Sequence, residues 1–136
     1  MGQFITKKDI VPLSAMFIAG AGDGMAEVLR YHYPAFKLRH PNANDAVWNP
    51  ALSWKNKYID YDGGNLGEPY PFAQTALVAF SDPYHGFRFV RNTGVKVAIV
   101  FKFGEKITFK EGIKDLILYS GAYAAGFWVT YEIIYK

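Results

Sequence analysis

The sequence lacks several features that would point to a familiar class of protein. It contains no cysteine, so it has neither a disulfide framework nor a thiolate metal site. It has three histidines and no HExxH motif, so the common signature of a zinc hydrolase is missing. The net charge of +3 is small, and the basic residues form no dense stripe interleaved with aromatic residues. These patterns argue against a nucleic-acid partner.

The chain of 136 residues has the size of one domain, and we expect a single unit over residues 1–136. Hydrophobic residues make up 51% of it and aromatic residues 18%. The mean hydropathy of −0.02 is low for a membrane protein. The average conceals an uneven distribution, because polar residues concentrate in 34–71 and long apolar runs lie on both sides of that segment.

The apolar runs predict an all-α membrane protein with about three transmembrane helices. The predicted spans are residues 10–33, a segment within 72–103, and residues 113–135. Each is long enough to cross a bilayer, which takes ~20 helical residues. Glycines at 20, 22 and 24, and small residues from 121 to 126, would permit close helix–helix contact. The polar, aromatic-rich segment 34–71 is predicted to be an extramembrane loop.

A competing interpretation applies to residues 95–109. Apolar residues alternate with other residues from Val95 to Phe103, and Gly104-Glu105-Lys106 then leads into a second apolar run. That pattern is also typical of a β-hairpin, which would belong to a soluble α+β domain.

Lysines and arginines suggest an orientation for the membrane interpretation. The connection from Lys102 to Lys114 carries four lysines, and Lys7 and Lys8 lie near the N-terminus. Three spans place these two segments on the same side, which the positive-inside rule makes cytoplasmic. The prediction is therefore a membrane location with a cytoplasmic N-terminus.

Charged residues inside the predicted spans define a candidate site. Charges in a bilayer are costly, so these side chains are expected to face the bundle interior and pair with one another. Asp23, Glu27 and Arg30 share one face of the first helix, because they are four and three residues apart. The expected buried polar cluster consists of Asp23, Glu27, Arg30, His32, Asp82, His85, Arg88 and Arg91.

The same cluster permits a catalytic interpretation. Glu27, Asp82 and His85 offer oxygen and nitrogen ligands for one divalent metal ion that could activate water. The structural alternative is an ion-pair network without turnover, and we favour it because two arginines lie close in sequence to the proposed ligands. We therefore commit to no catalytic residue and expect no cofactor, with one divalent metal ion as the alternative.

Aromatic and amide side chains stand out in the long loop. Trp48, Trp54, Asn56 and Tyr58 could bind a glycan or a lipid headgroup. Interfacial anchoring by tryptophan and tyrosine is the simpler interpretation, and we favour it.

Three motifs, WNPALSWKNKY, GEPYPFAQTALVAFSDPYHGFRF and AYAAGFWVTYE, carry a resemblance over most of the chain. They resemble an uncharacterised group of small polytopic membrane proteins of Bacteroidetes and their phages. The resemblance implies a membrane protein and directs attention to Trp54, Asn56, Asp82 and His85. It implies no activity.

The predicted function is that of an integral membrane protein acting as a structural or assembly component of a membrane complex, without enzymatic activity. Its expected partners are the lipid bilayer and either a second copy of the chain, in a homo-oligomer, or other subunits of a membrane complex. The alternatives are a membrane-embedded metal-dependent hydrolase and, second, a soluble α+β binding domain.

Overall fold

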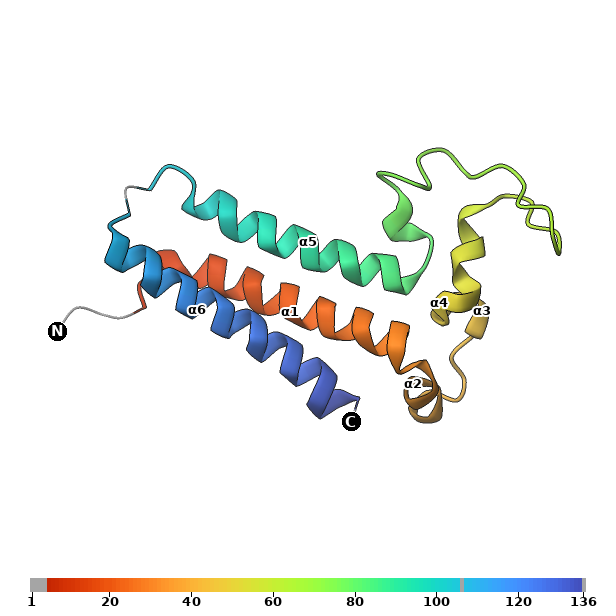
Figure 1. Ribbon diagram of the computed structural model, residues 1–136, viewed down its shortest axis with the longest axis horizontal. Helices are drawn as coiled ribbons and strands as arrows, with labels where there is room; N and C mark the ends of the chain where they lie inside the picture. Colours follow the sequence, from red (N-terminus) through yellow and green to blue (C-terminus); the bar gives the residue numbers. More distant parts are fainter. Residues whose placement is uncertain (1–4, 106, 136) are drawn as a thin grey trace.

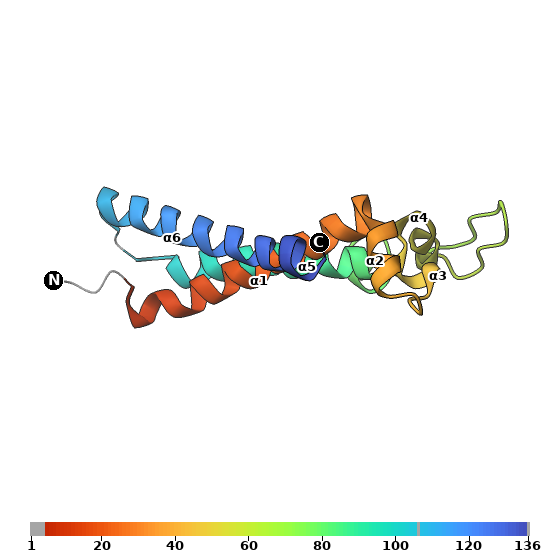
Figure 2. The same cartoon turned by 90° about the horizontal axis from the view of Figure 1, so that it is seen from below.

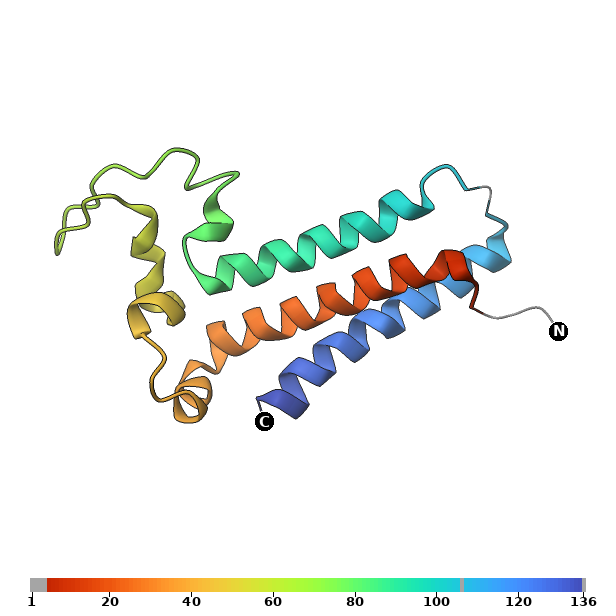
Figure 3. The same ribbon diagram turned by 180° about the vertical axis from the view of Figure 1, so that it is seen from behind.

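Three long helices dominate the computed structural model, which describes residues 5–105 and 107–135 and, of residues 133 and 134, the backbone alone. The helices are α1 (Ile10–Tyr31), α5 (Pro83–Lys102) and α6 (Phe109–Trp128). α1 lies between the other two and packs along both of them (Figure 1). The same order is visible from behind in Figure 3. Because α1 is the shared partner, its residues contribute much of the buried surface.

Short elements connect and extend these helices. The short helices α2 (Tyr33–Arg39), α3 (Asp45–Trp48) and α4 (Pro50–Ser53) follow α1. The remaining elements are the single turns η1 (Lys7–Asp9), η2 (Trp54–Lys57), η3 (Val78–Phe80) and the π-helical η4 (Val129–Ile134). The short helices and the long connection gather at one end of the elongated molecule, as the edge-on view shows (Figure 2).

The long helices begin at recognisable capping residues. Asp82 caps α5 by accepting a hydrogen bond from the backbone N–H of His85, and Pro83 occupies the first turn. Thr108 and Glu111 form a reciprocal capping box at the start of α6. These contacts satisfy backbone N–H groups that have no partner within the helix.

Glycines bring α1 close to both neighbours. A Cβ atom on Gly22 would lie 2.9 Å from the Phe87 carbonyl oxygen of α5, and one on Gly94 would lie 2.5 Å from the Ala15 carbonyl oxygen of α1. On the other side, a Cβ on Gly126 would collide with the Phe17 carbonyl oxygen. Distances this short are incompatible with a side chain, so glycine is required for the observed helix separation.

An aromatic core closes the end of the bundle near α2. Val28, Leu29 and Phe36 are almost fully buried there. The Phe36 ring stacks on Trp48 with 5.4 Å between centroids and lies 5.9 Å from the Tyr135 ring. The core thus joins α1, α2, α3 and the C-terminal segment.

The prediction of a membrane fold is wrong. No helix in the described part of the chain combines the length and the apolar character needed to cross a membrane. α1 lies within the predicted span 10–33, α5 lies within 72–103 as predicted, and α6 overlaps the predicted span 113–135 but begins earlier. Each of these helices carries several charged side chains. The predicted membrane location and the predicted cytoplasmic N-terminus both depended on those spans. They are therefore not supported.

The alternative of a β-hairpin over 95–109 finds no strand among the residues of this segment that the structure describes, 95–105 and 107–109. Residues 95–102 belong to α5, and the described residues contain no strand, only isolated bridges between Tyr58 and Pro69 and between Asp62 and Asn65. The alternation of apolar residues near Val95 is explained by a helix that is partly exposed on several sides. The α+β alternative therefore lacks its sheet among the described residues.

Candidate functional site

The polar cluster predicted from the sequence is divided into separate groups. The first joins all three long helices. Arg91 of α5 makes an ion pair with Asp23 of α1, with 2.9 Å between Nη1 and Oδ1. The Tyr123 hydroxyl of α6 donates a hydrogen bond of 2.6 Å to the other oxygen of Asp23. Burial, followed by this hydrogen bond to a carboxylate, raises the pKa of Tyr123, which remains protonated.

A small polar cavity lies beside this group, between α1 and α5. Its volume is about 80 Å³. Arg30 and Arg88 each donate a hydrogen bond of 3.2 Å to the same acceptor, the Tyr84 hydroxyl oxygen. Glu27 also lines the cavity, and so does Arg91. We call this space the arginine cavity.

Asp82 and His85 form a pair of their own at the start of α5. The His85 Nδ1 lies 2.7 Å from the Asp82 Oδ2, and the Ser81 hydroxyl donates to the same carboxylate. Burial would raise the pKa of Asp82, but the hydrogen bonds from His85 and Ser81 outweigh it and lower the pKa below the ordinary value. The carboxylate caps the helix and orients the imidazole ring.

His32 lies apart from the other predicted residues. It is exposed at the end of α1, and its Nε2 lies 2.5 Å from the Tyr131 hydroxyl oxygen. The two rings meet edge to face, with 5.4 Å between centroids. This contact joins the end of α1 to the C-terminal turn.

The three proposed metal ligands are not assembled. Glu27 lines the arginine cavity, whereas Asp82 and His85 pair with each other. Among residues 5–105 and 107–135, no three histidine, aspartate or glutamate side chains are grouped so that they could hold a metal ion. The metal-dependent hydrolase stays a prediction, and metal analysis can test it.

The loop residues singled out from the sequence have structural contacts. The indole N–H of Trp54 donates to the Ala51 carbonyl, and the Asn56 side chain donates to the Ala46 carbonyl. Tyr58 forms a backbone bridge with Pro69, and Trp48 stacks on Phe36. These contacts order the loop.

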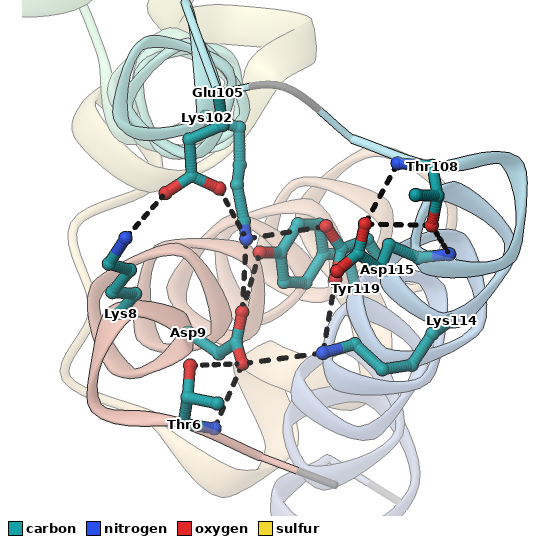
Figure 4. Close-up of polar contacts among 10 residues, drawn as sticks. Thr6, Lys8, Asp9, Lys102, Glu105, Thr108, Lys114, Asp115 and Tyr119 are labelled. Atoms are coloured by element: carbon teal, nitrogen blue, oxygen red, sulfur yellow. Dashed lines mark hydrogen bonds and ion pairs between the residues drawn. The ribbon is translucent and has the colours of Figure 1, made fainter.

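An extensively connected polar group that the sequence pattern does not predict lies at the opposite end of the bundle. Lys102, at the end of α5, is its centre (Figure 4). The Lys102 Nζ lies 3.1 Å from Asp9, 3.1 Å from Glu105 and 3.3 Å from Asp115. We call this set of contacts the Lys102 network. It joins the start of α1, the end of α5 and the start of α6.

Lys114 provides a second cation for the Lys102 network. Its Nζ lies 3.6 Å from Asp9 and 3.7 Å from Asp115. The Asp9 side chain is 1% exposed and also accepts hydrogen bonds from the backbone N–H and the hydroxyl of Thr6. Charges this deeply buried require partners, and here two lysines face two buried carboxylates.

The pKa shifts in the Lys102 network favour full ionisation. Burial would raise the pKa of Asp9, but hydrogen bonds from Thr6 and Lys102 place it well below the ordinary 3.8. Burial would likewise lower the pKa of Lys102, but its bonds to Asp9 and Glu105 raise the pKa above the ordinary 10.5. The ion pairs of Lys102 with carboxylates at the start of α1 and at the start of α6 therefore hold the three helices together at this end.

Large apolar side chains remain uncovered on α5 and α6. Those with more than half of their surface exposed are Phe89, Ile99, Val100 and Phe101 on α5, and Phe109, Leu116, Ile117 and Trp128 on α6. Between these two helices lies a groove of about 460 Å³ over Met16 of α1. Val95, Ile99 and Phe103 line it on the α5 side. Ile99 is the one of these exposed side chains that also lines the groove. We use the name α5–α6 face for the groove together with the exposed apolar side chains of α5 and α6, the two helices that flank α1.

No family model, curated protein or solved structure matches this chain. The resemblance drawn from the three sequence motifs accordingly stays a prediction.

Proposed function

We propose that the protein is a structural or assembly component that associates with further copies of itself through the α5–α6 face. The observation that carries the proposal is the exposure of large apolar side chains along two helices. Leu116 and Ile117 of α6 are 67% and 62% exposed, and Val100 of α5 is 68% exposed. Extended apolar surfaces of this kind mark interaction sites.

The α5–α6 face suits a second copy of the chain because it offers both protruding and receding apolar surface. Leu116 and Ile117 are exposed on α6, and Val95 and Ile99 line the groove on the α5 side. A surface with both features can be self-complementary about a two-fold axis, which is the commonest symmetry of protein dimers.

Charge also supports a helix-to-helix contact. From Leu116 to Tyr131 the sequence of α6 and the following turn contains no charged residue. Two copies of this α6 stretch can meet without desolvating a charged side chain of the stretch itself, and each Å² of apolar surface removed from water contributes about 25 cal/mol. A contact of this composition favours a stable assembly.

The test is the mass of the particle in solution. Light scattering after size-exclusion chromatography should show a multimer for the wild-type chain. Ile117→Glu places a charge in the proposed interface and should shift the mass towards that of one chain, 15.3 kDa. Ile59→Glu is the matched control, because Ile59 is 63% exposed in the loop and lies outside the α5–α6 face.

A wild-type chain that stays monomeric at high concentration would overturn the proposal. An unchanged multimer in the Ile117→Glu variant would place the association elsewhere. Equal dissociation by Ile117→Glu and Ile59→Glu would show that added charge alone disperses the particles.

A further inference from the structure

We propose that the arginine cavity binds a phosphoryl group, either as free phosphate or as the phosphate of a monoester. The inference is independent of self-association, because the cavity lies between α1 and α5 and is not part of the α5–α6 face. Three guanidinium groups reach it from two helices, from Arg30, Arg88 and Arg91.

The charges around the cavity are unequally paired. Asp23 holds Arg91 in an ion pair at 2.9 Å. Arg30 and Arg88 have no carboxylate partner within ion-pairing distance among the described residues, and both donate to the neutral Tyr84 hydroxyl. Two cations therefore converge on one uncharged oxygen, and an anion between them would relieve their repulsion.

The geometry and the chemistry of the donors favour an oxyanion. A guanidinium group presents several N–H donors in one plane and matches the oxygens of phosphate better than a lysine does. The phosphate oxygens would accept from Arg30 and Arg88 as the Tyr84 hydroxyl does now. The volume of about 80 Å³ admits a group of phosphate size and leaves no space for a nucleoside or a sugar.

The negative charge of Glu27 weakens the binding of an anion, so its removal should have the opposite effect to removal of an arginine. It lines the same cavity and is half-buried, so its carboxylate repels a bound phosphate. Arg30 is exposed and marks the side from which a ligand can enter. Removing the positive charge of Arg88 should weaken binding, whereas removing the negative charge of Glu27 should strengthen it.

The experiment is calorimetric titration of the full chain with inorganic phosphate at constant ionic strength. Arg88→Gln should weaken binding by at least about tenfold, because hydrogen bonds to charged groups contribute that much. Glu27→Gln should strengthen binding severalfold. Lys96→Gln is the matched control, since it removes one positive charge from an exposed position of the same helix and should leave binding unchanged.

Absence of saturable phosphate binding by the wild-type chain would overturn the proposal. Equal weakening by Arg88→Gln and Lys96→Gln would also overturn it, because phosphate would then respond only to net charge. Far-UV circular dichroism checks that the variants fold, and the expected gain in Glu27→Gln cannot arise from unfolding. Titration with phosphoserine separates the sources: equal affinity indicates a monoester, and a much weaker one indicates free phosphate.

Discussion

Replacing Lys102 with methionine removes the central charge of the Lys102 network and keeps a flexible apolar stem. In the wild-type chain the Lys102 Nζ faces Asp9, Glu105 and Asp115 and is itself largely buried. Removing one partner of a buried ion pair costs about 3–5 kcal/mol, because the other charge is left without compensation. Lys114 stays within 3.6 Å of Asp9 and 3.7 Å of Asp115 and offsets part of that cost. We therefore expect the free energy of unfolding at pH 7 to fall by about 2–4 kcal/mol.

The pKa shifts define the pH range of this effect. The pKa of Asp9 is lower in the folded chain than the ordinary 3.8, so its contribution to stability is complete above that pH and is lost as the pH falls below it. The pKa of Lys102 is raised above 10.5, so its contribution is complete below that pH and is lost at higher values. The difference between wild type and Lys102→Met should thus be constant near neutrality and shrink below pH 3.8.

Urea unfolding followed by circular dichroism measures the difference at several pH values. Lys96→Met is the matched control, because Lys96 is exposed on the same helix and its loss should change the free energy by less than about 0.5 kcal/mol. The reasoning would be refuted if both variants lost the same free energy, or if the loss in Lys102→Met did not diminish in acid.

Three further predictions concern packing, a tyrosine and metal content. Gly126→Ala should lower the free energy of unfolding by about 1–3 kcal/mol, because its Cβ would collide with the carbonyl of the packed helix α1; Gly121→Ala meets open space and should raise it by up to about 1 kcal/mol. Burial and a 2.6 Å hydrogen bond to Asp45 raise the pKa of Tyr33 to about 12. Asp45→Asn should therefore lower the pKa of Tyr33, as measured by NMR titration. An unchanged pKa would mean that burial is its sole cause. We expect elemental analysis to find the purified chain metal-free. His85→Ala should lower the free energy of unfolding by about 1–2 kcal/mol, because the buried Asp82 loses a hydrogen bond. A stoichiometric zinc or manganese signal that disappears in the variant would instead support the metal-dependent hydrolase.

Local signals in the sequence predicted where the long helices lie, to within a few residues at the better-marked ends. Pro34 follows a 22-residue helix that ends at Tyr31. Small residues at 20, 22 and 24 predicted close helix contacts, and the structure places the carbonyls of α5 and α6 against them. Such signals are readable because capping and close packing depend on the identity of the residue at one position.

Average apolar character was a poor guide to the surroundings of the helices. The runs around α5 and α6 predicted membrane spans, yet their charged residues leave no described helix apolar enough for that role. The sequence pattern makes Lys102 and Lys114 the flanking charges of a loop, whereas the fold places both of them against the carboxylate of Asp9 at the start of α1.

The sequence by itself determined approximately where the three long helices lie and which small residues allow them to approach. It did not determine the short helices α2, α3 and α4, which occupy much of the segment 34–71 predicted as a loop. Only the tertiary structure decided which charges meet. Asp9 and Lys102 are 93 positions apart, and Asp23 and Tyr123 are 100 apart. Spacing along one helix places Asp23, Glu27 and Arg30 on a common face. It could not show that Asp23 pairs with Arg91 of another helix. Nor could it show that Arg30 and Arg88 meet at the arginine cavity. The physical reason is that periodicity fixes the face of a helix, whereas an ion pair depends on the separation and axial offset of two helices, which the packing of their glycines sets.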